Sequence, residues 1–259
     1  MTISGRCFSS SVLLGLASLV AAGSAEAQSQ DRGYFSTDVE FGAVWSARND
    51  VRIPGDTGTE FDMNDLIGSG PEFFARLGAL WQINAVHGVR LVVAPFEVDG
   101  SGTLSRETEF AGETFAAGAT EATYKFNAYK LSYRYTFYDR AAWRWRAGVT
   151  AIIRDANIEL RQGALAANDD DLGFVPTLHL SGEYRMSERW RFAFDFDGLA
   201  GGPGRLVDLA LKVEHDLNDR WRIGAGYRLF EGGVDTDEVY NFGWFNYAVL
   251  GVEYRFGGD

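Results

Sequence analysis

Residues 244–256 read WFNYAVLGVEYRF, and this stretch alternates between two kinds of side chain. Successive side chains of a β-strand point to opposite sides, so positions two apart share a face. One face is apolar apart from Asn246, and it comprises Trp244, Ala248, Leu250, Val252, Tyr254 and Phe256. The other face ends in the charged pair Glu253 and Arg255. The stretch therefore predicts a strand with one apolar side and one partly charged side.

The apolar face closes on an aromatic residue, Phe256, which only Gly257, Gly258 and Asp259 follow. This arrangement resembles the C-terminal assembly signal of bacterial outer-membrane β-barrels, small barrels of the OmpA and OmpW type among them. In that family the last strand pairs with the first and closes the sheet. The resemblance implies about nine further strands that alternate in the same way, and it implies the outer membrane as the location.

The first 27 residues predict a secretory signal peptide. Arg6 gives a short positive region, residues 12–22 (VLLGLASLVAA) form an apolar core, and Ala25-Glu26-Ala27 is a small-x-small cleavage site. The expected mature domain is thus residues 28–259, with the sole cysteine, Cys7, removed. No other stretch approaches the roughly 18 to 20 uninterrupted apolar residues that a transmembrane helix needs. Any membrane span must therefore be made of strands.

The formal net charge of −12 restricts the partners. An acidic chain argues against nucleic acid, and its composition predicts no basic patch for anionic lipid. For an outer-membrane barrel the expected partners are the lipid and lipopolysaccharide of that membrane and the barrel-assembly machinery, with the protein itself a monomer.

Ten segments alternate between apolar and polar residues, which predicts an all-β chain folded as an antiparallel transmembrane β-barrel. The alternative is eight strands, because the second and third segments alternate least clearly. Long loops are expected at 46–70, 97–121 and 231–241. A change of phase in the fourth segment predicts a bulge near Asn127, and the fifth shows the same change after Ile153. The ten segments are 34–45, 72–83, 88–98, 122–138, 143–160, 174–186, 190–197, 207–217, 221–230 and 244–256.

Aromatic residues of the apolar face are expected at the two membrane interfaces, where amphipathic rings are favoured. Each tryptophan lies near the end of a segment with the parity of the apolar face. A soluble sandwich or lipocalin-like barrel is the rival interpretation, but its interior would be overfilled by these rings. The predicted interface aromatics are Trp45, Trp81, Trp143, Trp145, Trp190, Trp221, Trp244 and Phe256.

The opposite face carries charges of both signs, which predicts a network of ion pairs inside the barrel. A barrel of this size is only somewhat wider than its side chains can fill. We therefore expect a plug with at most a narrow polar lumen, and a small-solute, porin-like channel is the alternative. The predicted inward charges are Asp38, Glu40, Arg76, Arg90, Lys130, Arg134, Arg144, Arg146, Glu183, Arg185, Arg191, Asp195, Asp197, Asp208, Lys212, Glu214, Arg222, Arg228, Glu253 and Arg255.

His179 and Ser181 are the residues that suggest chemistry. The pair resembles the His-x-Ser pair of the outer-membrane lipid A deacylases, which implies an esterase. Here Gly182-Glu183 stands where that family has Asn-Ala, and the pair has the inward parity, whereas the deacylases present it to lipid. The omptin proteases also have ten strands, yet Glu214-His215 does not supply their Asp-x-His.

The predicted function is therefore that of a non-enzymatic outer-membrane barrel with a structural or surface-interacting role. No cofactor is implied, because the Gly198–Gly204 stretch lacks a phosphate-loop lysine. The three histidines are dispersed along the chain, which favours no metal site.

Overall fold

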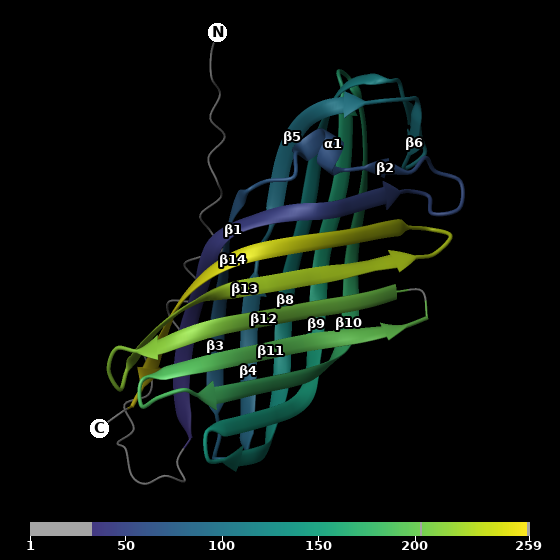
Figure 1. Cartoon of the computed structure of the whole chain (residues 1–259). Helices are drawn as coiled ribbons and strands as arrows, with labels where there is room; N and C mark the ends of the chain where they lie inside the picture. Colours follow the sequence, from purple (N-terminus) through teal and green to yellow (C-terminus); the bar gives the residue numbers. More distant parts are fainter. Residues whose placement is uncertain (1–32, 203, 258–259) are drawn as a thin grey trace.

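The computed structural model describes residues 33–202 and 204–257, and these form one closed antiparallel β-barrel with a small cap of loops at one end (Figure 1). The predicted signal peptide lies outside the described residues. No helix in the described part of the chain is long and apolar enough to cross a membrane. Ten strands make the wall: β1 (Tyr34–Arg52), β3 (Glu72–Gln82), β4 (His87–Ala94), β8 (Gly118–Arg140), β9 (Trp143–Gln162), β10 (Leu165–Arg185), β11 (Trp190–Gly201), β12 (Gly204–Asp216), β13 (Trp221–Asp235) and β14 (Tyr240–Phe256).

The barrel closes where β14 pairs with β1, and this confirms the role predicted for residues 244–256. Phe35 stands opposite Phe256, and the antiparallel ladder runs from there to Arg52 and Tyr240. The rings of Phe35 and Phe256 lie 5.4 Å apart between centroids. Closure pairs the first strand with the last, which is the arrangement that lets a sheet stand in lipid.

The outward face of the wall is apolar, as the alternation predicts. Leu178 is 60% exposed, and its strand neighbours His179 and Thr177 are buried inside. Six of the seven tryptophans are exposed on this outward face, and Trp145 stacks on Trp143 with ring centroids 5.5 Å apart. An exposed apolar band ringed by aromatics is the surface that a bilayer covers. The placement of these rings at the membrane interfaces stays a prediction.

The strands are longer at one end than the sequence pattern indicates, so parts of the expected loops are wrong. β1 continues to Arg52 instead of ending at Trp45, and β10 begins at Leu165 instead of Phe174. Residues 97–121, expected as a loop, contain strand β5 (Glu97–Leu104) and the hairpin β6 (Thr108–Phe110) and β7 (Glu113–Phe115). Backbone pairing continues beyond the apolar band because neighbouring strands can hydrogen-bond in water as well as in lipid.

The bulge expected near Asn127 is also wrong. Asn127 stands opposite Asp155 in an unbroken register, and the shift in this ladder lies between Thr136 and Tyr138. The apolar parity changes because Tyr124, near the loop end of β8, is buried inside the barrel instead of facing lipid. The same explanation holds in β9, where Ile158 and Leu160 are buried.

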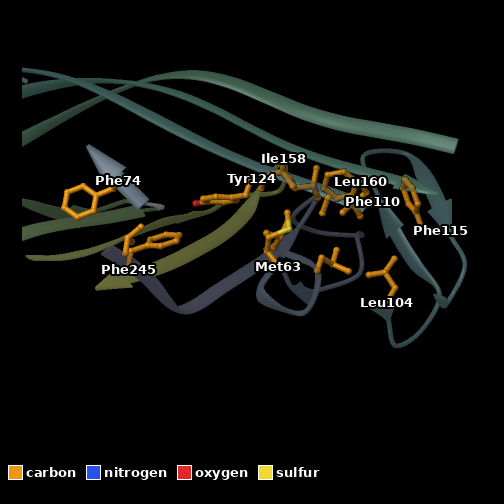
Figure 2. Packing of buried hydrophobic residues seen from close by; sticks show 14 of the residues in the cluster. Met63, Phe74, Leu104, Phe110, Phe115, Tyr124, Ile158, Leu160 and Phe245 are labelled. Atoms are coloured by element: carbon orange, nitrogen blue, oxygen red, sulfur yellow. The ribbon is translucent and has the colours of Figure 1, made fainter. Parts of the chain in front are cut away.

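An apolar core therefore fills the loop end of the barrel (Figure 2). The cap packs on it: strand β2 (Phe61–Asp62), helix α1 (Asn64–Ile67), β5, and the β6–β7 hairpin. Met63, Phe110 and Phe115 are fully buried there. Toward the middle of the barrel the core continues as a group of rings that we term the aromatic layer: Phe74, Phe96, Tyr124, Phe126, Phe230, Phe245 and Tyr247.

Candidate functional site

The middle of the lumen holds a cluster of ion pairs built from inward positions of six strands. Lys130 of β8 donates to Asp208 of β12 at 2.5 Å and to Asp197 of β11 at 3.1 Å. Arg228 of β13 bonds both Asp208 and Glu40, with 2.8 Å to the latter. All five of these side chains are buried. Such charges can be buried only because each meets an opposite charge at hydrogen-bond distance. The sixth strand, β3, contributes Arg76.

A second group of ion pairs lies toward the opposite end from the cap. Arg222 contacts Asp216 at 2.7 Å and Glu253 at 2.9 Å. Arg146 donates to Glu183 at 2.7 Å. The remaining pairs of this half join Arg191 to Glu183 and Asp216, Arg134 to Asp195, Arg90 to Asp38, Lys212 to Glu40 and Glu214, and Arg222 to Glu214.

The structure thus brings most of the predicted inward charges together. Three lie at the rim: Arg185 is 55% exposed and 3.7 Å from Asp139, Arg144 pairs with the same Asp139, and Arg255 folds back on Glu253. The sequence pattern did not indicate the aromatic layer, which lies in series with the ion pairs. The signal for it was present, since Phe74, Phe230 and Phe245 all have the inward parity.

A polar cavity of about 200 Å³ remains among the ion pairs. Its walls carry eleven Lys or Arg side chains against seven Asp or Glu side chains. The lining surplus is positive in a chain whose net charge is −12, and Asp139, Asp208 and Asp216, which pair with cations of this lining, reduce it to one charge. An anion would therefore be favoured only slightly over a cation inside the barrel.

His179 lies buried in the lumen, on the inward side that its parity predicts. Its Nδ1 is 2.8 Å from Asp197 Oδ1, and its Nε2 is 3.1 Å from Ser181 Oγ. This order of hydrogen bonds matches that of a hydrolytic triad. However, Asp197 also accepts from Thr150 at 2.7 Å and from Lys130. The arrangement is equally that of a fully satisfied polar network, which buried polar groups require.

The same histidine belongs to a group that could hold a metal ion. Ligand atoms of His179, Asp195 and Asp197 lie within 4.8 Å of one another. Arg134 and Lys130 already neutralise the two carboxylates, at 2.7 and 3.1 Å. A divalent cation would have to displace these protein cations, so the residues present do not favour one.

We expect Ser181→Ala to leave the acylation pattern of lipid A unchanged when the protein is overproduced. Leu178 and Leu180 are the lipid-side neighbours of the pair, whereas Ser181 is buried beside charges that an acyl chain would have to desolvate. Mass spectrometry of extracted lipid A measures the outcome. Acyl loss with the wild type, abolished by Ser181→Ala and by His179→Asn, would contradict it.

The cap presents a strongly acidic surface. Residues 46–70 and 97–121 together hold eleven Asp or Glu against three Arg. Burial is the main cause that raises the pKa of the Asp62 carboxyl, and the neighbouring Asp50 and Asp65 raise it further. An outer surface of this charge repels anions and attracts cations.

No family model and no curated protein sequence matches the chain. Among solved structures, the outer membrane protease OmpT from Escherichia coli superposes with a TM-score of 0.54 at 9% identity, over 90% of this chain and 99% of that one. The outer membrane protein AlkL gives a TM-score of 0.40 at 15% identity, over 92% and 96%. Neisserial surface protein A gives 0.37 at 13%, over 86% and 97%. With its closed ten-stranded wall and its outward apolar band, the protein has the fold of an outer-membrane β-barrel.

Proposed function

We propose that the protein is a non-enzymatic, non-conducting outer-membrane barrel that acts through the surface it presents. The observation that carries this proposal is a lumen blocked twice in series. Ion pairs fill the half away from the cap, and the aromatic layer and the apolar core of the cap fill the other half. An ion would have to break buried pairs and then cross a dry layer of rings, and each step opposes conduction.

The cap supports a surface role. Its loops pack on an apolar core of their own, with Phe110, Phe115 and Leu160 fully buried, so they form a fixed surface. The acidic face of this cap would complement a cationic partner. OmpT is a protease by its name, but a likeness at 9% identity extends to the fold alone.

We expect recordings across planar bilayers to show no stable ohmic steps from the wild-type protein. The test is strengthened by a variant in which Phe74, Phe126 and Phe245 are all changed to alanine. This variant removes the centre of the aromatic layer and leaves the ion pairs in place. It should still conduct little, with any residual current selective for anions because of the positive lining.

Large and stable steps from folded wild-type protein would overturn the proposal and favour the porin-like channel. Heat-modifiable gel mobility of the same preparation shows that the reconstituted protein is folded.

A further inference from the structure

The barrel wall has a gap between β3 and β4 on the side of the cap. β3 pairs with β1 along its whole length, from Glu72 to Gln82, but it pairs with β4 only from Leu77 to Gln82. After Val93 the chain no longer pairs with β3, but it stays beside β8. β4 pairs with β8 up to Ala94, β5 pairs with β8 from Glu97, and the exposed Pro95 lies between these two strands. Proline has no N–H to donate to a ladder. Residues 72–76 and 94–98, which would be partners if the register of β3 and β4 continued, are therefore not paired with each other in the described structure.

The gap lies within the apolar band. Phe74 stands opposite Gly42 of β1, and the exposed Trp45 lies three residues further along that strand. Phe73, on the outward side of the gap, is 73% exposed. The longer loops of outer-membrane barrels are extracellular, which places the cap outside. The opening then meets the hydrocarbon of the outer leaflet next to Trp45, an expected interfacial residue.

A mainly apolar pocket of about 50 Å³ lies behind the gap. Residues from both of its edges line this pocket: Phe74 and Arg76 on one, Pro95 and Phe96 on the other. Rings of the aromatic layer form its sides, and Lys130 and Asp208 of the central ion pairs form its polar end. The pocket is therefore amphipathic, with an apolar entrance and a charged floor.

Among the cations of the two ion-pair groups, Arg76 makes the longest contacts, and its side chain is 12% exposed. Its guanidinium reaches Glu40 at 4.0 Å and Asp208 at 3.5 Å, whereas charge-assisted hydrogen bonds measure about 2.7 to 2.9 Å. Its Nε has no hydrogen-bond partner in the described part of the chain, which is also true of the Nε of Arg134, Arg191 and Arg228, so the long contacts are what distinguish Arg76. A mostly buried guanidinium with no close hydrogen bond, at the end of an apolar pocket, is a site for a carboxylate or phosphate oxygen.

We propose that this pocket binds a single-chain anionic amphiphile of the fatty-acid type, which enters through the gap between β3 and β4. The carboxylate accepts from Arg76, and the first methylenes lie among Phe74, Phe96 and Phe126. The pocket holds only a short stretch of chain, so the remainder lies in the gap and in the outer leaflet. The positive surplus of the lumen slightly favours the anion. Binding in this pocket does not require conduction and stands apart from the proposed surface role.

Photolabelling of the full-length protein in lipid nanodiscs tests the proposal. The probe is palmitate that carries a diazirine close to its carboxyl group, and peptide mass spectrometry locates the label. We expect labelled peptides from the inward side of β8 and β14, around Phe126, Ala128 and Phe245. An excess of unlabelled palmitate should remove this label, and an excess of methyl palmitate, which lacks the charge, should not.

Two variants separate the carboxylate contact from the apolar pocket. Arg76→Gln should lower labelling at least about tenfold, the loss expected of one charge-assisted contact, and Arg76→Lys should restore most of it. Ala128→Leu should lower labelling by filling the pocket. The matched controls are Arg134→Gln and Ala193→Leu, which alter the polar cavity instead and should label as the wild type does.

Heat-modifiable mobility identifies the variants that remain folded. Label confined to outward residues such as Tyr129 and Leu131 would overturn the proposal, since it would show only lipid contact at the wall. Undiminished labelling in folded Arg76→Gln and Ala128→Leu would overturn it as well.

Discussion

Phe256→Asp is expected to remove the heat-modifiable, folded form of the protein from the membrane fraction, with a loss of more than about tenfold. Phe256 forms the first pair of the closing ladder, against Phe35, and its ring also contacts Tyr254 at 4.8 Å between centroids. This pairing joins the two ends of the described chain, so its residues are further apart in sequence than those of any other strand pair in the barrel. The loop-closure entropy of such a contact must be overcome before the contact stabilises the fold. A carboxylate here would weaken that pairing and face lipid.

The matched control is Phe137→Asp. Phe137 is an exposed aromatic near the same end of the barrel, in β8, but it takes no part in closure. Charged substitutions close to a membrane interface cost only about 0 to 1 kcal/mol. Equal amounts of folded protein from Phe256→Asp and Phe137→Asp would show that the closing strand has no special role in assembly.

The strand pattern could be predicted from the sequence because the wall has one apolar and one polar side. Each inward arginine and outward tryptophan follows the period of two, and Arg222 beside Trp221 is an example. The pattern fails where the polarity of the two sides is reversed. At the loop end of β8 the inward Tyr124 is apolar and the outward Thr123 and Lys125 are polar, which reverses the rule that holds in lipid. If the rule that holds in lipid is applied along the whole of β8, it requires a bulge near Asn127, and the ladder has none there.

The lumen charges could be predicted as a set but not as pairs. Lys130 and Asp208 are 78 residues apart along the chain, and only the stagger of the strands places them at the same height. Likewise, the side chains of His179 and Asp197 meet because these two residues stand opposite each other in the ladder between β10 and β11. The gap beside Pro95 could not be predicted either, because it depends on strand register. In the sequence, a strand with a partner on one side looks the same as a strand with partners on both sides.

The acidic surface and the positive lumen are two parts of one charge distribution. The cap segments carry most of the net negative charge, and the cavity lining carries a surplus of positive charge. Neither could be inferred from the total of −12, which had predicted only an acidic protein. The lumen depends on its carboxylates for stability, since they are in the minority there and most of them serve more than one cation.

Asp208→Leu is accordingly expected to destabilise the barrel by about 3 to 5 kcal/mol, the cost of leaving buried charges without a partner. Asp208 is 2% exposed and is shared by Lys130, Arg228 and, at 3.5 Å, Arg76. Its loss leaves Arg76 and Lys130 with one carboxylate contact each, Glu40 at 4.0 Å and Asp197 at 3.1 Å. Asp208→Asn, which keeps the shape and one acceptor oxygen, should fall between this variant and the wild type. Urea unfolding of the protein in lipid vesicles, followed by tryptophan fluorescence, measures the difference.

Asp139→Leu serves as the control for the Asp208 variants. Asp139 also meets two arginines, Arg144 at 2.8 Å and Arg185 at 3.7 Å, but its side chain is 37% exposed at the rim. Water can replace the carboxylate there, so the expected loss is below about 1 kcal/mol. If Asp208→Leu costs no more than Asp139→Leu, water must reach Lys130 and Arg228 as freely as it reaches the rim. The lumen would then be a hydrated passage at its centre, and the non-conducting barrel would be the wrong description of this protein.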